Sequence, residues 1–206
     1  WRPAESGRMP RRVGVASYYR FSPAALRTPS FLDAKLSTRG EGLPTFLNKI
    51  LANDRAAFDE LEAALCGRFP YYRTERKTIR LDPCKFRKAD FEAGKFVEKD
   101  ALRVSFGTRH GKVLPAAMVS DGVMLSLAYI AVRYAPDRPD ILLIEEPENG
   151  VHHASLKEIV GTLKAISDSG TQVMLTTHSP FLVDLVEPDQ VRVFAKGDDG
   201  AVHAAR

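Results

Sequence analysis

Two adjacent acidic residues stand at the end of a short apolar run in the second half of the chain. Residues 141–144 are Ile-Leu-Leu-Ile, and Glu145, Glu146 and Pro147 follow directly. This pattern is typical of a buried parallel strand that carries carboxylates at its C-terminal end. Side chains alternate along a strand, so one carboxylate could hold a metal ion while the other orients a water molecule. The plainer alternative is a strand that simply stops at an acidic turn.

A second strand-like segment leads to an imidazole. Residues 172–176 predict a second buried strand, and Thr177 and His178 follow it. A helical pattern over residues 154–168 separates this segment from the first strand, with a predicted buried stripe of Leu156, Ile159, Val160, Leu163 and Ile166. Strand, helix and strand in this order predict a right-handed parallel crossover, in which both strands end at the same edge of the sheet. That edge is where α/β sheets bind ligands. We therefore expect His178 to emerge near Glu146, where it could sense a phosphate, although a lone histidine is more often an ordinary polar residue.

A third segment could bind phosphate through the backbone. Ser120, Asp121 and Gly122 precede an almost unbroken apolar helix over residues 123–134. Serine or aspartate caps such a helix well, and a glycine leaves its N-terminus open to a close ligand. Exposed N–H groups and the helix dipole favour an anion at that position. An ordinary capped core helix is the alternative.

Composition and charge set limits on the class of protein. The chain has 206 residues, of which 44% are hydrophobic and 27% charged, with a formal net charge of +4. One or two soluble domains are expected, and the positive charge permits a nucleic-acid partner. Cys66 and Cys84 lack metal-site spacing, and we expect reduced thiols in a cytoplasmic protein. No apolar run approaches the roughly 20 residues that span a bilayer, so no membrane partner is expected.

The remaining elements can be predicted more coarsely. The expected elements are a strand over 13–19, a loop with a helical turn over 21–30, a helix capped by Thr45, a helix from Asp54, short strands and turns over 71–110 that include a hairpin turn from Gly107 to Gly111 into Val113, and a closing hairpin over 191–204. The texture changes near residues 111–115, which predicts a subdomain boundary there.

Residues 71–99 are rich in lysine and arginine and also contain several aromatic residues. Such a mixture could follow a nucleic-acid backbone. Acidic residues are mixed in throughout, so we favour a solvated face of a small β-subdomain.

Taken in order, three segments resemble a known family. They are VSDG before the apolar helix, ILLIEEPENGVHH, and VMLTTHSP. Together they resemble ABC-type ATPases of the RecF/SMC kind, and most closely bacterial AAA-type ATPases such as the ATPase half of the overcoming-lysogenization-defect (OLD) nucleases. The stretch YYRFSPAALRTPSFLD, the two helices after it and FPYY look like the lid that is inserted in these proteins.

The resemblance implies an α/β fold with a P-loop NTPase-like (ABC ATPase type) parallel-sheet core and an inserted helical and β lid subdomain. Residues 1–44 would join the lid, residues 45–114 would form it, and residues 115–206 would form the C-terminal part of the ATPase core.

The resemblance also implies ATP and Mg²⁺ as cofactors and a role for each candidate residue. Ser120, Asp121 and Gly122 would form the signature segment that reaches the γ-phosphate held by a partner subunit. Glu145 would take the magnesium position, and Glu146 would polarise the attacking water. Asn149 to His152 would form the D-loop at the dimer interface, and His178 would be the switch histidine. A metal site at His152 and His153 is not expected, because adjacent residues on a regular element face different directions.

One family motif is missing from residues 1–206. No G-x-x-x-x-G-K-[ST] pattern occurs, and this phosphate-binding loop with its lysine is central to nucleotide binding. We expect the loop to lie N-terminal to Trp1 in a longer protein. This polypeptide alone is then expected to bind ATP weakly or not at all.

Three functions follow as hypotheses. The first is the C-terminal part of an ATP-hydrolysing engine that acts as a nucleotide-driven homodimer clamp in DNA repair or phage defence, with DNA and a nuclease or other effector as candidate partners. The second is a non-catalytic regulatory or interaction domain that retains the ATPase fold. The third, which is less favoured, is a metal-dependent nuclease that uses Glu145, Glu146 and Glu148.

Overall fold

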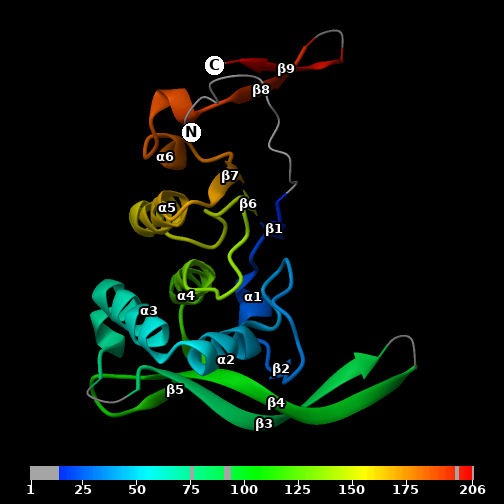
Figure 1. Cartoon of the computed structure of the whole chain (residues 1–206), viewed down its shortest axis with the longest axis vertical. Coiled ribbons are helices and arrows are strands. Elements are labelled where there is room, and N and C mark those ends of the chain that lie inside the picture. Colours follow the sequence, from blue (N-terminus) through cyan, green and yellow to red (C-terminus); the bar gives the residue numbers. More distant parts are fainter. Residues whose placement is uncertain (1–13, 75–76, 91–93, 198–199, 206) are drawn as a thin grey trace.

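A three-stranded parallel sheet, called sheet A here, positions the candidate residues. A computed structural model describes residues 14–74, 77–90, 94–197 and 200–205 of the chain. Sheet A has the order β1 (Ala16–Tyr19), β6 (Ile141–Glu145) and β7 (Gln172–Thr176), so the strand that carries the glutamate pair is central. Both neighbours run parallel to β6, which confirms the predicted crossover between β6 and β7 (Figure 1).

Two helices pack beside sheet A. The helix α4 (Asp121–Arg133) is buried on all sides from residue 123 to residue 132, which agrees with its nearly continuous apolar sequence. The helix α5 (His153–Asp168) connects β6 to β7 and buries the predicted stripe of Leu156, Ile159, Val160, Leu163 and Ile166. These helices and one face of sheet A form the upper part of a continuous hydrophobic core.

The described residues cover only one face of sheet A. On the core side, Leu142 and Ile144 are almost fully buried. On the opposite face, Tyr18 and Met174 are 42% and 54% exposed. The strand predicted over residues 172–176 is found, but the prediction that it is buried is wrong, because β7 lies at the edge of sheet A as described and packs on one face only.

A second, antiparallel sheet and two helices form the lower part of the molecule in Figure 1. The helices are α2 (Leu43–Asn53) and α3 (Arg55–Arg68), and α3 begins after Asp54, close to the predicted start. The side chain of Asp54 caps α3 by accepting a hydrogen bond from the N–H of Ala57. The helix α2 begins two residues before Thr45, so Thr45 does not cap it. Instead its hydroxyl donates to the carbonyl of Phe31.

The largest difference from the sequence prediction lies between residues 79 and 107. The sequence predicts short strands, but β3 (Ile79–Asp90) and β4 (Lys95–Gly107) form one long hairpin with unbroken pairing. The charged distal part has no alternation of apolar and polar residues, so its strand character comes from cross-strand pairing. The edge strands β2 (Ser30–Phe31) and β5 (Val113–Pro115) pair with β4, and the predicted turn into Val113 is confirmed.

Smaller elements complete the described chain. They are α1 (Pro23–Leu26), η1 (Pro70–Tyr72), η2 (Ala116–Met118), α6 (Pro180–Val183), η3 (Pro188–Gln190), and the hairpin of β8 (Val193–Lys196) with β9 (Val202–Ala205). This closing hairpin agrees with the sequence prediction, and it lies at the end of the molecule opposite the β3–β4 hairpin (Figure 1). Among the described residues, no helix combines the length and apolar character that crossing a bilayer requires.

Candidate functional site

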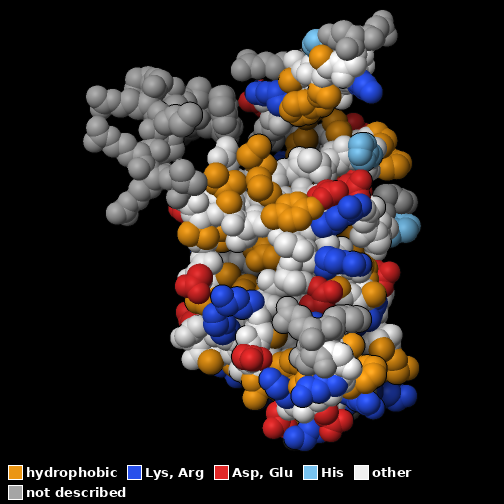
Figure 2. Space-filling view, turned by 90° about the vertical axis from the view of Figure 1, so that its right-hand side faces the viewer, with side chains coloured by type: hydrophobic (Ala, Val, Ile, Leu, Met, Phe, Trp, Pro, Cys, Tyr) orange, Lys and Arg blue, Asp and Glu red, His pale blue; other side chains and the backbone are white. Residues whose placement is uncertain are grey.

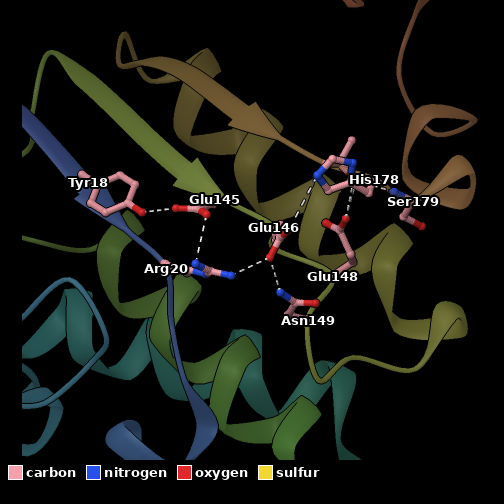
Figure 3. Close-up of polar contacts among 9 residues, drawn as sticks. Tyr18, Arg20, Glu145, Glu146, Glu148, Asn149, His178 and Ser179 are labelled. Atoms are coloured by element: carbon pink, nitrogen blue, oxygen red, sulfur yellow. Dashed lines mark hydrogen bonds and ion pairs between the residues drawn. The ribbon is translucent and has the colours of Figure 1, made fainter. Parts of the chain in front are cut away.

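The glutamate pair, Glu145 and Glu146, lies at the C-terminal end of β6 (Figure 3). Tyr18 in the neighbouring strand β1 and Arg20 directly after it contact the pair. The hydroxyl of Tyr18 donates to Glu145. The guanidinium of Arg20 lies between the two carboxylates, with Nη1 3.1 Å from Oε1 of Glu145 and Nη2 3.0 Å from Oε2 of Glu146. Parallel pairing of β1 with β6 brings these residues together although they lie far apart in the chain.

Glu146 has an unusual backbone conformation. Its φ angle is +47°, and among the described residues it is the one non-glycine residue with positive φ. A left-handed conformation costs an ordinary residue roughly 1–2 kcal/mol and is often found at functional sites. Asn149 stabilises the turn, because its side-chain amide donates to Oε2 of Glu146 at 2.6 Å and its N–H donates to the carbonyl of Glu146 at 3.0 Å.

The structure places the imidazole of His178 beside this turn. Nε2 of His178 lies 3.8 Å from Oε1 of Glu146, and the His178 side chain is 91% exposed. The expected proximity of His178 and Glu146 at one sheet edge is therefore found. The imidazole is also open to a ligand, and it can donate a hydrogen bond to an anion.

Glu148 connects the turn after β6 to the loop after β7. Its Oε1 accepts a hydrogen bond from the hydroxyl of Thr177 at 2.5 Å and another from the N–H of His178 at 3.1 Å. Its Oε2 is buried and has no hydrogen-bond partner within the described part of the chain. Burial raises the pKa of Tyr129 in the core, and the negative charge of Glu148 raises it further. Glu148 therefore positions the loop that carries His178.

The proposed signature segment lies elsewhere on the surface. Ser120 occupies the N-cap position of α4, but its side chain makes no capping hydrogen bond and is exposed. Asp121 forms an ion pair with Arg27 at 2.6 Å, and Arg27 also donates to the carbonyls of Ala116 and Val119. Arg27 thus holds the segment before α4. A Cβ added at Gly122 would contact nothing within 4 Å, so the surface in front of this helix end is open.

The turn over residues 149–152 packs against the start of α4. Gly150 has a φ of +79°, and a Cβ at this position would lie 3.9 Å from Cβ of Asp121 and 3.3 Å from Pro23. The positive φ therefore favours glycine here, and an added Cβ would also lie close to Pro23. His152 is exposed, and its carbonyl accepts the N–H of Ser155 at the start of α5. The side chain of His153 lies outside the described residues.

The charged groups at the end of β6 are suited to binding a cation together with phosphates. The hydrogen bond to Glu145 raises the pKa of Tyr18, so this phenol stays protonated. Magnesium is commonly held by one or two carboxylates that act with waters and substrate phosphates. Glu145 supplies one carboxylate, and the described residues contain no group of three or more His, Cys, Asp or Glu side chains placed to hold a metal. A single carboxylate at Glu145 is compatible with a magnesium ion whose other ligands are waters and phosphate oxygens, and Arg20 pairs with that carboxylate in this structure.

Several of these residues carry no clear signal in the sequence. Tyr18 and Arg20 are predicted only as part of a strand and its end, and Arg27 as part of a loop. Glu148 is suggested only as a nuclease ligand. The one available signal is that the YYR triplet, residues 18–20, overlaps the end of the strand predicted over residues 13–19. Local sequence does not show which strand this segment pairs with.

Comparisons with known proteins identify the family. The model of a family described as "AAA domain, putative AbiEii toxin, Type IV TA system" matches residues 3–184. The chain belongs to this AAA-domain family. The AAA-domain assignment agrees with the parallel sheet A and confirms the expected fold class.

Two curated relatives support an ABC-type ATPase. A "Putative ABC transporter ATP-binding protein" of Methanosarcina acetivorans is 40% identical over 65 residues, which cover 29% of this chain and 23% of the relative. A protein of the same description from Caldanaerobacter subterraneus subsp. tengcongensis is 27% identical over 144 residues, covering 67% of this chain and 58% of the relative. The chain thus spans about a quarter of the length of the first relative and somewhat over half of the length of the second. This AAA domain is of the ABC type.

Proposed function

We propose that this AAA domain carries the hydrolysis residues of a RecF/SMC/OLD-like ATPase that works as a nucleotide-driven dimer clamp. The observation that supports this most strongly is the position of His178, 3.8 Å from Glu146 at the shared edge of β6 and β7. The strained conformation of Glu146 adds support, because such strain is retained where the surrounding structure fixes a side chain for a task.

Each side chain has a role that its environment permits. Glu146, which is 22% exposed, would accept a hydrogen bond from a water molecule and orient it for attack. His178 would donate a hydrogen bond to a phosphate oxygen. Glu145 would contribute to holding magnesium, which supplies charge stabilisation when bound. Arg20 balances both carboxylates in the present arrangement and would have to move when a cation approaches Glu145.

The clamp itself is proposed from the surface near α4. Ser120 is exposed, space beside Gly122 is open, and the turn at Gly150 lies next to Asp121. A helix N-terminus on this surface could reach a phosphate that a second subunit holds. ATP would then join two half-sites, and hydrolysis would separate them. We place such a cycle in DNA repair or phage defence in the cytoplasm, with a nuclease or other effector as a partner.

The substitution Glu146→Gln in the native protein tests the proposal. Glutamine keeps the size and the hydrogen bond from Asn149 but is a poor proton acceptor. Turnover of ATP should fall by roughly 10²–10⁴-fold, while ATP-dependent dimers, measured by light scattering, should persist. The control is Glu60→Gln, which changes an exposed glutamate on α3 and should leave turnover unchanged.

Three results would contradict the proposal, and two of them identify an alternative. If wild-type protein does not hydrolyse ATP, a regulatory domain that retains only the fold is favoured. If Glu146→Gln abolishes metal-dependent DNA cleavage that needs no ATP, the site is a nuclease. Unchanged ATP turnover in Glu146→Gln would show that this carboxylate does not orient the water.

A further inference from the structure

The β3–β4 hairpin separates its charged residues onto two faces. Its strands pair without interruption from Ile79 opposite Phe106 to Asp90 opposite Lys95. Residues directly opposite each other in an antiparallel pair share a face, and alternate residues along each strand share that face as well. The register therefore assigns every residue of the hairpin to one of two faces, although the linear sequence mixes acids and bases.

The first face, called the paired face here, contains Ile79 and Phe106 at its base. There it packs into the core, where Val104 and Phe106 are 2% and 0% exposed. Farther out it carries two bases and two acids. Nζ of Lys85 lies 2.8 Å from Oδ1 of Asp100, and Arg87 stacks over the ring of Phe96 at 4.3 Å opposite Glu98. The formal charges on this face balance.

The second face, called the basic face, contains five exposed cations and two acidic positions. The cations are Arg80, Lys88, Lys95, Lys99 and Arg103, and the acids are Asp82 and Asp90. The Asp82 carboxylate already interacts with Arg80 at 3.5 Å and accepts a hydrogen bond from Ser105 at 2.5 Å. The formal charge of this face is therefore +3, compared with zero on the paired face.

Neighbouring groups leave most of these cations available. Within the described residues, no ion pair involves Lys88, Lys95, Lys99 or Arg103. Lys99 lies over the ring of Phe31 at 5.9 Å. A hydrogen bond from Ser37 lowers the pKa of the Glu41 carboxyl, and the positive charges of Arg39 and Lys88 lower it further. Figure 2 looks at the side toward which the hairpin projects and shows both Lys or Arg and Asp or Glu side chains at the lower end of the molecule, so the division between the two faces comes from the strand register.

We infer that the basic face binds the phosphate backbone of double-stranded nucleic acid without reading its sequence. Lys95 and Arg103 are eight residues apart on one strand, so the face is about 27 Å long, which matches about eight nucleotide steps of a duplex. A two-stranded ribbon also has the width that the major groove of B-DNA admits. The face offers lysines, which contact phosphates as point charges.

A duplex fits this surface better than a single strand does. Single strands usually stack their bases on aromatic side chains. The aromatic rings on this face, Phe31 and Phe86, are packed against each other at 5.7 Å and are only partly exposed. This inference concerns a surface away from the glutamate pair, and it rests on the proposed function only for its biological setting.

The test is fluorescence anisotropy with a labelled duplex of about 20 base pairs, without nucleotide, between about 50 and 200 mM NaCl. With about four phosphate contacts, log K should fall with log salt at a slope of about −3.6, and affinity should drop by about 10²-fold over this range. The double variant Lys88→Gln/Lys99→Gln should reduce the slope by about 1.8 and weaken binding to unrelated duplexes equally.

The matched control is Lys85→Gln/Arg87→Gln, which removes the same charge at a similar distance from the hairpin tip but on the paired face. Its salt slope should stay within about 0.5 of the wild-type slope. Equal losses in the two double variants would overturn the inference, as would absence of duplex binding at the lowest salt concentration. Equal competition by polyglutamate of the same total charge would also overturn it and indicate an acidic protein partner. Because no ATP is present, these outcomes are independent of the Glu146→Gln result.

Discussion

Glu148 provides a direct test of how the two loops of the site are held together. Its carboxylate joins the turn after β6 to the loop that carries His178. We predict that Glu148→Ala lowers the free energy of unfolding by about 2 kcal/mol. We also predict that it releases the histidine loop while leaving β6 and β7 paired.

The magnitude follows from three contributions. Two hydrogen bonds to an ionised carboxylate contribute roughly 1.5–3 kcal/mol each. Water replaces part of this after truncation, because Thr177 is only partly buried and His178 is exposed. Truncation also removes the buried Oε2, which has no partner in the described structure and whose desolvation costs about 1–2 kcal/mol. The expected net loss is therefore well below the sum of the two hydrogen bonds.

The assay combines urea unfolding followed by circular dichroism with amide hydrogen exchange. For a chain of this length, a loss of about 2 kcal/mol corresponds to a fall in melting temperature of about 4–8 °C. Exchange at the His178 amide should accelerate by roughly tenfold or more, because its acceptor is lost. Glu148→Gln keeps one acceptor oxygen and should cost about half as much.

The control for Glu148→Ala is Glu60→Ala, an exposed change on α3 that should alter stability by less than about 0.5 kcal/mol. Equal urea midpoints for these two variants would refute the reasoning. So would unchanged exchange at the His178 amide, because that would show that the loop is held by other contacts.

Two further predictions concern the lower part of the molecule. Burial raises the pKa of Glu62, whose Oε1 accepts the N–H of Ile79 at 2.6 Å. The folded state therefore holds this proton more tightly than the unfolded state does, so the free energy of unfolding should fall as pH rises from the ordinary pKa of 4.5 through the raised pKa. Glu62→Gln should remove this pH dependence and be at least as stable as the wild type at neutral pH. Urea unfolding at several pH values would measure both effects. Asp54→Ala removes the cap that accepts the Ala57 N–H at 3.0 Å and should cost about 1 kcal/mol. The conservative variant Asp54→Asn should retain most of the stability, and an unchanged urea midpoint in Asp54→Ala would contradict the cap prediction.

Local sequence is informative where one periodic pattern decides the structure. The stripe from Leu156 to Ile166 predicts α5 because residues three and four apart lie on one helix face. The apolar run before Glu145 predicts β6, and Asp54 marks the start of α3. The ordered motifs indicate the ABC-type ATPase family without help from the fold, and the family comparison confirms this.

Local sequence fails where partners lie far apart in the chain. Its pattern predicts short strands in place of the long hairpin because the distal residues are charged on both faces, and only pairing shows that the charges divide between the faces. It suggests Glu148 as a candidate ligand, although this carboxylate binds the loop after β7. The left-handed conformation of Glu146 has no residue-type signal, since glycine or asparagine is usual there.

The amino-acid sequence by itself determined which segments become the central strand and helices, and which residues stand at their ends. Hydrophobic periodicity acts over a few residues, so it can be read from a single chain. Tertiary structure decided that β1 pairs with β6, and hence that Tyr18 and Arg20 meet the glutamate pair. It also decided that Glu148 fixes the loop of His178, because such contacts depend on strand order and register between distant segments.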